Sequence, residues 1–225
     1  MKYKLILFDA DGTLFDFEKA EKNAFHTAMK EFGIKEKIAE FHYSYEIINK
    51  AIWQEFQEKK ITSEKLRIER FRRFFTKMQL DLDPVKVSPF YLQKLSEGID
   101  LLPFAEEVVK YFHGKCEIAL ATNGLSEVQR PRFAASKLSE YFKHIFISEE
   151  IGFPKPNSEF FEHIFSKLPF SDSTIIVGDN LTSDIKGGND FGIDTCWFNP
   201  QKCFNNSDFI PTYEIGKLED LKEII

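Results

Sequence analysis

Cysteine is scarce in this chain, and the few thiols present are not spaced to bind one another or a metal ion. Cys116, Cys196 and Cys203 are odd in number and show no CxxC spacing. This argues against a disulfide framework and against a zinc site. The five histidines are likewise scattered without metal-ligand spacing. The thiols are therefore expected to be reduced, as in cytosolic proteins.

The chain also lacks a long apolar run near its start and an excess of positive charge. The first apolar stretch, Leu5 to Phe8, ends at Asp9, which is too short for a membrane span and unlike a signal region. The net charge of −6 disfavours a surface that binds nucleic acid polymers through their phosphates. We therefore expect a cytoplasmic protein that associates with neither membrane nor nucleic acid. The sequence predicts no oligomeric state.

What the chain does contain is an alternation of short apolar runs and amphipathic segments. This alternation is typical of a parallel sheet wrapped by helices, the α/β class with a Rossmann-like core. Runs with few charges, each followed by polar residues or glycine, predict buried parallel strands. These runs are residues 3–8, 117–121, 144–147, 174–177 and 194–198.

A long insertion separates the first two predicted strands. A βαβ crossover needs only about a dozen residues or somewhat more, far fewer than the stretch between these strands. Apolar residues in the insertion recur at helical spacing, as at Phe71, Phe74 and Phe75. Thr62 and Asp83 are suited to cap helix N-termini. We expect an all-helical module over residues 16–97, and a core made of residues 1–15 and 98–225.

Polar residues follow the predicted strands at the points where the strands end. In parallel sheets the carboxyl ends of the strands meet at one edge, where ligands collect. The residues expected there are Asp9, Asp11, Thr122, Asn123, Lys155, Asp179 and Asp184. Four carboxylates cannot all stay ionised in one place without a cation, and Lys155 supplies only one positive charge. A divalent ion with oxygen ligands, Mg²⁺, would complete the set.

The order of these elements resembles the haloacid dehalogenase (HAD) superfamily of phosphohydrolases. DxDGT starts at Asp9, TN at Thr122, KP at Lys155 and GDxxxxD at Gly178. The resemblance covers essentially the whole chain and implies a HAD core with a C1-type helical cap at residues 16–97. It also implies Mg²⁺-dependent hydrolysis of a small phosphorylated metabolite through an aspartyl-phosphate.

The resemblance assigns a role to each residue of these motifs. Asp9 would attack phosphorus and bind the metal, and Asp11 would act as acid and then base while its carbonyl binds the metal. Lys155 would neutralise phosphoryl charge. The remaining assignments are Thr122 and Asn123 as phosphate-binding residues, Asp179 as a metal ligand, and Asp184 as a ligand nearby or through water.

A narrower resemblance concerns the substrate. Residues 178–188 and 192–199, the opening stretch 9–17, and Ile48 and Asn49 with Trp53 are similar to the bacterial house-cleaning pyrimidine nucleotidases of this superfamily. It implies a nucleoside 5′-monophosphate substrate, with Asn49 and Trp53 as cap residues that contact it. A packed aromatic inside the cap is an equally open interpretation of Trp53. The cluster Arg67, Arg70, Arg72 and Arg73 is expected to be mostly a solvated helix face, with substrate contact as the minority alternative.

Other functions stay open at this point. Within the enzymes, the alternatives are a phosphatase of phosphoglycolate or a sugar phosphate, and a phosphomutase. Dehalogenation of 2-halo acids needs no acid at the position of Asp11, so Asp11 argues against it. A nucleotide-sensing binding protein would not need both the nucleophile Asp9 and the acid Asp11.

Overall fold

A parallel sheet forms the core of the molecule. The computed structural model describes residues 1–169 and 172–225, and within them six strands pair in the order β3-β2-β1-β4-β5-β6. All neighbouring strands are parallel. The strands are β1 (Leu5–Phe8), β2 (Glu117–Thr122), β3 (His144–Ile147), β4 (Thr174–Gly178), β5 (Asp194–Phe198) and β6 (Tyr213–Ile215).

The five predicted strands are confirmed, with shifts of one or two residues at some ends. The edge strand β6 was not predicted. Its three residues include the charged Glu214, so neither its length nor its composition sets it apart from a loop. The α/β fold class is therefore confirmed, and the sheet is one strand wider than the sequence pattern indicated.

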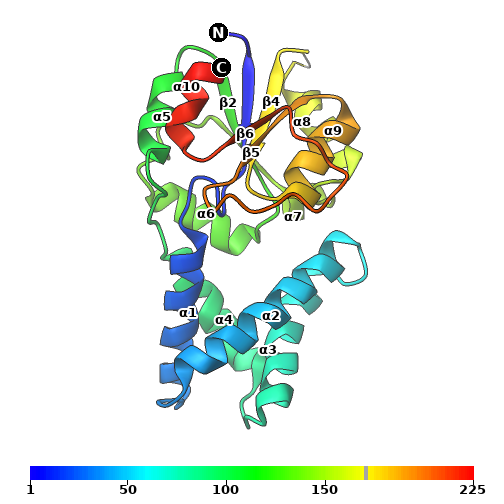
Figure 1. The fold of residues 1–225 in the computed structure, drawn as a ribbon. Coiled ribbons are helices and arrows are strands. Elements are labelled where there is room, and N and C mark those ends of the chain that lie inside the picture. The colour runs from blue at the N-terminus through cyan, green and yellow to red at the C-terminus, as the bar shows by residue number, and fades with distance from the viewer. Residues whose placement is uncertain (170–171) are drawn as a thin grey trace.

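Helices cover both faces of this sheet (Figure 1). Because side chains alternate along a strand, Ile6 and Phe8 of β1 face one apolar layer while Leu5 and Leu7 face the other. The first layer is completed by α5 (Ala105–Phe112), α6 (Ser126–Ala135) and α10 (Leu221–Ile224). The second is completed by α7 (Ser148–Ile151), α8 (Ser158–Lys167) and α9 (Lys186–Phe191).

The insertion between β1 and β2 folds into α1 (Phe17–Glu31), α2 (Ile38–Gln57), α3 (Ser63–Met78) and α4 (Pro84–Ser96). The predicted caps are confirmed: Thr62 accepts a hydrogen bond from the Lys65 amide, and Asp83 accepts one from the Val85 amide. Aromatic rings fill the centre of this cap, where Tyr45 stacks on Phe71. Many of the 25 phenylalanines of the chain are used here and in the core.

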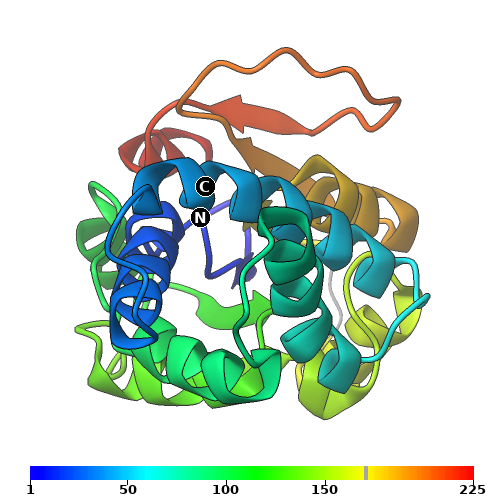
Figure 2. The same cartoon turned by 90° about the horizontal axis from the view of Figure 1, so that it is seen from below.

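The cap lies at the edge of the sheet where the strands end, and both chain termini lie at the opposite edge (Figure 1). Seen from below, the four cap helices lie in front of that edge (Figure 2). Two hydrogen bonds join the two chain segments that connect the core to the cap. One runs from the Leu102 amide to the Leu14 carbonyl and the other from the Asp16 amide to the Asp100 carbonyl, each 2.9 Å. We propose residues 16–97 as the cap domain, with residues 1–15 and 98–225 as the core.

No helix in the described ranges, residues 1–169 and 172–225, is long and apolar enough to cross a lipid bilayer.

Candidate active site

A buried lysine lies at the centre of the strand ends. The Lys155 Nζ donates to Asp9 Oδ1 at 2.7 Å, to Asp184 Oδ1 at 2.6 Å and to the Ala121 carbonyl at 2.6 Å. An ammonium group has three donors, so these contacts use all of them. Asp9 directly follows β1, and Asp184 lies in a π-helical turn (Leu181–Ile185) after β4. The parallel sheet therefore gathers side chains far apart in sequence around one cation.

The backbone of Lys155 is held by the amide side chain of Asn123. Asn123 Nδ2 donates to the Lys155 carbonyl at 2.9 Å, and its Oδ1 accepts from the Lys155 amide at 2.8 Å. Thr122 Oγ1 accepts from the Gly124 amide at 3.0 Å in the same turn. The structure thus gives the Asn123 side chain a positioning contact that sequence reasoning did not foresee. Phosphate binding by Thr122 and Asn123 stays a prediction.

The electrostatics of this cluster show an excess of negative charge. Burial raises the pKa of Asp9 well above its usual value; Lys155 opposes this, and Asp184 and Asp179 raise it further. Burial alone would lower the pKa of Lys155, but the carboxylates of Asp184 and Asp9 outweigh it and raise that pKa. The pKa of Asp179 is also raised, by desolvation first and by Asp184 second.

These carboxylates fit a divalent cation with oxygen ligands. Oxygens of Asp9, Asp179 and Asp184 all lie within 4.8 Å of one another. A cation there would offset the repulsion that raises the pKa values of Asp9 and Asp179. Position 12 requires glycine for a steric reason. The φ of Gly12 is +83°, and a Cβ there would lie 2.5 Å from Asp179 Oδ2. Only glycine lets the loop after β1 pass this close to Asp179.

The carboxylate of Asp11 is held by two residues that sequence reasoning missed. Gln129 Nε2 donates to Asp11 Oδ2 at 2.5 Å, and the guanidinium of Arg132 forms an ion pair with Asp11 Oδ1. Both lie on α6, three residues apart and therefore on one helix face. The sequence signal for Gln129 and Arg132 was this spacing on a helix that starts just after the Thr122–Asn123 turn.

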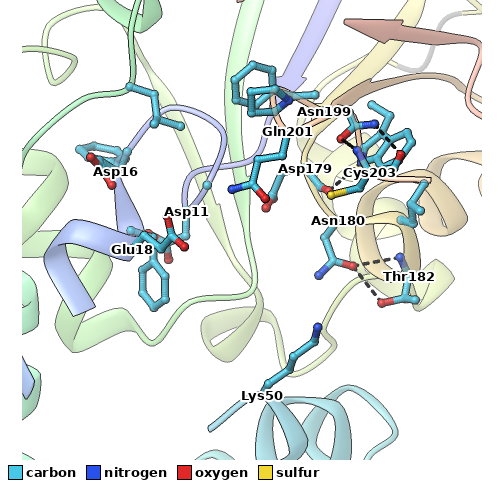
Figure 3. A pocket seen from close by; sticks show the side chains of 18 residues that line it. Asp11, Asp16, Glu18, Lys50, Asp179, Asn180, Thr182, Asn199, Gln201 and Cys203 are labelled. Carbon is cyan, nitrogen blue, oxygen red and sulfur yellow. Dashed lines mark hydrogen bonds between the residues drawn. The ribbon is translucent and has the colours of Figure 1, made fainter. Parts of the chain in front are cut away.

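A cleft of about 590 Å³ opens beside Asp11 and Asp179. Its walls come from the loops after β1, β4 and β5 and from the cap (Figure 3). Lys50 of α2 points toward it from the cap side, opposite Asn180 and Thr182. The other lining residues include Phe17, Trp197, Asn199 and Gln201. The cleft therefore offers one cationic group, aromatic rings and amides next to the carboxylates.

The two predicted substrate contacts in the cap lie elsewhere. Asn49 is buried and donates its Nδ2 to Glu21 Oε1 at 2.6 Å. Trp53 is half-buried and packs edge-on against Phe56 within the aromatic cluster of the cap. Among the described residues, the side chain from this part of α2 that lines the cleft is Lys50. Substrate contact by Asn49 and Trp53 stays a prediction.

The arginines of α3 divide into three environments. Arg72 and Arg73 are exposed and pair with Glu69 and Glu55, as expected for a solvated helix face. Arg70 is buried inside the cap beside Tyr91. Arg67 crosses to the core, where its Nη1 lies 2.8 Å from Glu149 Oε1 and its Nε pairs with Glu127. The expectation of a single solvated face was wrong for Arg67 and Arg70, because a helix packed between neighbours presents several faces to protein.

Comparison with known proteins identifies the family. Residues 3–192 match the haloacid dehalogenase-like hydrolase family. The chain is 36% identical over 228 residues to pyrimidine 5′-nucleotidase PynA of Streptococcus pneumoniae, covering 100% of this chain and 96% of that protein. It is 30% identical over 230 residues to pyrimidine 5′-nucleotidase YjjG of Escherichia coli, covering 100% and 99%.

A solved structure agrees with these sequence matches. The fold superimposes on the magnesium-bound crystal structure of YfnB from Bacillus subtilis with a TM-score of 0.93 at 37% identity. The superposition covers 100% of this chain and 99% of that one. The full-length matches and the strand-end cluster agree, and the chain is an enzyme that belongs to the haloacid dehalogenase-like hydrolase family.

Proposed function

We propose that this enzyme is a Mg²⁺-dependent phosphatase that hydrolyses pyrimidine nucleoside 5′-monophosphates through an aspartyl-phosphate. The observation that carries the phosphatase part is the contact of Lys155 with both Asp9 and Asp184 in a buried cluster. A carboxylate nucleophile needs a neighbouring positive charge to receive an anionic phosphoryl group, and this geometry provides one.

The first half-reaction forms a bond from an Asp9 carboxylate oxygen to phosphorus and breaks the bond from phosphorus to the leaving oxygen. Asp11 gives its proton to that oxygen, which leaves as the nucleoside hydroxyl. Lys155 balances charge on the phosphoryl oxygens, with the Thr122 hydroxyl and the backbone amide of Asn123 as further donors. Positioning and charge stabilisation of this kind supply most of the catalysis in phosphoryl transfer.

The second half-reaction releases phosphate and restores the carboxylates. Asp11, now ionised, takes a proton from water while the water oxygen attacks phosphorus. The bond from Asp9 to phosphorus breaks, and inorganic phosphate leaves. Asp9, the Asp11 carbonyl and Asp179, with Asp184 directly or through water, would hold Mg²⁺, which neutralises charge on the phosphoryl oxygens when bound.

The pyrimidine preference rests on the relatives and on the cleft. Two full-length relatives are named pyrimidine 5′-nucleotidases. The cleft of about 590 Å³ lies within the usual size range of small-molecule sites. Amide side chains such as Asn199 and Gln201 can pair with the edge of a base, and the ring of Phe17 gives it an apolar face. Asn49 and Trp53 stay our candidates for substrate contacts from the cap, which would require the cap to move relative to the core.

Phosphate release from a substrate panel tests this function. UMP, dUMP and dTMP should outperform phosphoglycolate and hexose phosphates, with activity in Mg²⁺ and none in a chelator. Preference for a non-nucleotide ester would reject the nucleotidase part and leave the phosphatase part standing. Isomerised sugar phosphate without free phosphate would indicate a phosphomutase, and nucleotide binding without turnover would indicate a sensor.

A further inference from the structure

Arg132 is a buried charged residue that no role discussed so far requires. Its side chain is 0% exposed, and its guanidinium pairs with Asp11 Oδ1. Removing a cation from water is costly unless its contacts are good, so a fully buried arginine needs a reason to be there. It does not line the cleft among the described residues, and it therefore reaches the chemistry only through Asp11.

The guanidinium also contacts the last turn of α4 and the segment where the chain enters the cap. Arg132 Nη2 donates to the carbonyl of Leu95, in the last turn of α4, at 3.1 Å. Its Cζ atom also lies 5.7 Å from the ring centre of Phe15 and 5.9 Å from that of Phe17, where the chain enters the cap. Arginine is suited to this site because its planar fork can bond in two directions and stack on rings.

Gln129 holds the second oxygen of the same carboxylate. Its side chain is 1% exposed and passes directly over Gly124, where a Cβ would lie 2.1 Å from Gln129 Nε2. The glycine after the Thr122–Asn123 turn therefore leaves the space through which Gln129 reaches Asp11. Both carboxylate oxygens of Asp11 are held by α6, which also packs against the cap through Val128 and the preceding Leu125.

We propose that Arg132, held by the Leu95 carbonyl of α4 and assisted by Gln129, is a positioning residue for Asp11. The inference rests on the proposed phosphatase function, in which Asp11 gives a proton to the leaving oxygen and later takes one from water. A proton donor acts only within hydrogen-bond reach of the oxygen it protonates. Without Arg132 the Asp11 carboxyl loses its fixed direction, and the step that suffers is protonation of the leaving group.

The test is a series of substituted phenyl phosphates whose leaving phenols differ in acidity. A well-placed acid makes kcat/KM depend weakly on that acidity, because poor leaving groups are protonated as they depart. For Arg132→Ala we expect kcat/KM for phenyl phosphate to fall about tenfold to hundredfold, which is part of the roughly 10²–10⁴-fold that acid–base catalysis contributes, and to fall far less for 4-nitrophenyl phosphate. Arg132→Lys, with a cation but no fork, should give an intermediate dependence.

Two further variants separate positioning from folding. Gln129→Met removes the second Asp11 contact without leaving a buried charge. Like Arg132→Ala, it should make kcat/KM depend more steeply on the acidity of the leaving phenol. Arg130→Ala is the matched control on the same helix, since Arg130 is exposed and pairs with Glu150 away from Asp11. It should leave the dependence unchanged.

The outcomes separate the two hypotheses. Equal losses across the whole series in Arg132→Ala, Arg132→Lys and Gln129→Met would overturn the positioning role, because a structural defect lowers all rates together. The series contains no nucleotide, so the result does not depend on the substrate preference. If the unmodified enzyme hydrolysed none of these esters, the proposed phosphatase function would fail instead.

Discussion

The ammonium group of Lys155 lies 2.7 Å from the carboxylate of Asp9, although 146 positions separate the two residues in the chain. Both are almost fully buried. A pair of this kind would orient Asp9 as the proposed nucleophile and offer positive charge where a phosphoryl group would arrive. It also leaves Asp179 and Asp184 without a full counter-charge, and that deficit is the physical basis of the metal proposal.

Asp9→Asn should reduce turnover to below about 1% of the unmodified rate, because an amide cannot form the acyl-phosphate. The amide keeps the size of the side chain, so the fold and substrate binding should survive. Phosphate release measures the loss, and equilibrium binding of UMP serves as the control. Retention of more than a few per cent would remove Asp9 from the role of nucleophile.

Asp179→Ala should weaken Mg²⁺ binding and lower activity, with partial recovery at high Mg²⁺. Calcium should inhibit the unmodified enzyme, because its larger and looser coordination disturbs in-line attack. Metal titration followed by calorimetry measures the affinity independently of turnover. Asp190→Ala is the control, since Asp190 is exposed and pairs with Lys186. Full activity of the unmodified enzyme in a chelator would sink the metal-dependent mechanism.

Lys50→Ala and Trp53→Ala together test which face of α2 contacts the substrate. Binding energy from a remote base positions the phosphate, so a lost contact lowers kcat/KM for UMP more than for 4-nitrophenyl phosphate. We expect such a selective loss for Lys50, which lines the cleft. The substrate contact expected for Trp53 predicts the same selective loss. Equal losses on both substrates would mean that Trp53 only packs the cap.

Glu21→Gln should stabilise the protein at neutral and alkaline pH. Burial raises the pKa of Glu21 from 4.5 to about 7, with the Asn49 hydrogen bond opposing, Glu46 adding to it and Arg70 opposing. The folded state then holds the proton more tightly than the unfolded chain, so this group's contribution to stability is full below about pH 4.5. It is lost as pH rises to about 7, for a total of about 3 kcal/mol.

Thermal unfolding between pH 5 and 8 measures this effect. The advantage of Glu21→Gln over the unmodified protein should be largest at pH 8 and should shrink toward pH 5. His42 lies 3.9 Å from Glu21, and burial lowers its pKa, so the comparison is made between variants at each pH. Glu31→Gln, at the exposed end of the same helix, is the control. A constant difference at every pH would contradict the assignment.

Much of the fold was predictable because it follows from local pattern. Short apolar runs followed by glycine or polar residues predicted β1 to β5, and the excess length before β2 predicted the inserted helices. Thr62 and Asp83 marked helix starts because their side chains accept hydrogen bonds from nearby amides. The short strand β6 carries no such pattern, and it forms only because the edge of β5 is available for pairing.

The clustering of the strand-end residues was predictable for a topological reason. Parallel strands end at one edge, so the residues after β1, β3 and β4 had to meet there once the strands were recognised. The sequence by itself therefore determined that Asp9, Asp179 and Lys155 share one site. It did not determine the partners of these residues, because a hydrogen bond across 118 positions, such as that of Gln129 with Asp11, leaves no local pattern.

Which helix face points inward was decided by tertiary packing alone. Arg70 and Arg73 lie three residues apart on α3, yet one is buried against Tyr91 and the other is exposed beside Glu55. In the same way, Asn49 and Lys50 are neighbours on α2, but one binds Glu21 inside the cap and the other faces the cleft. Helical periodicity predicts that a helix has faces, whereas only the packing of its neighbours decides which face meets solvent, cap or substrate cleft.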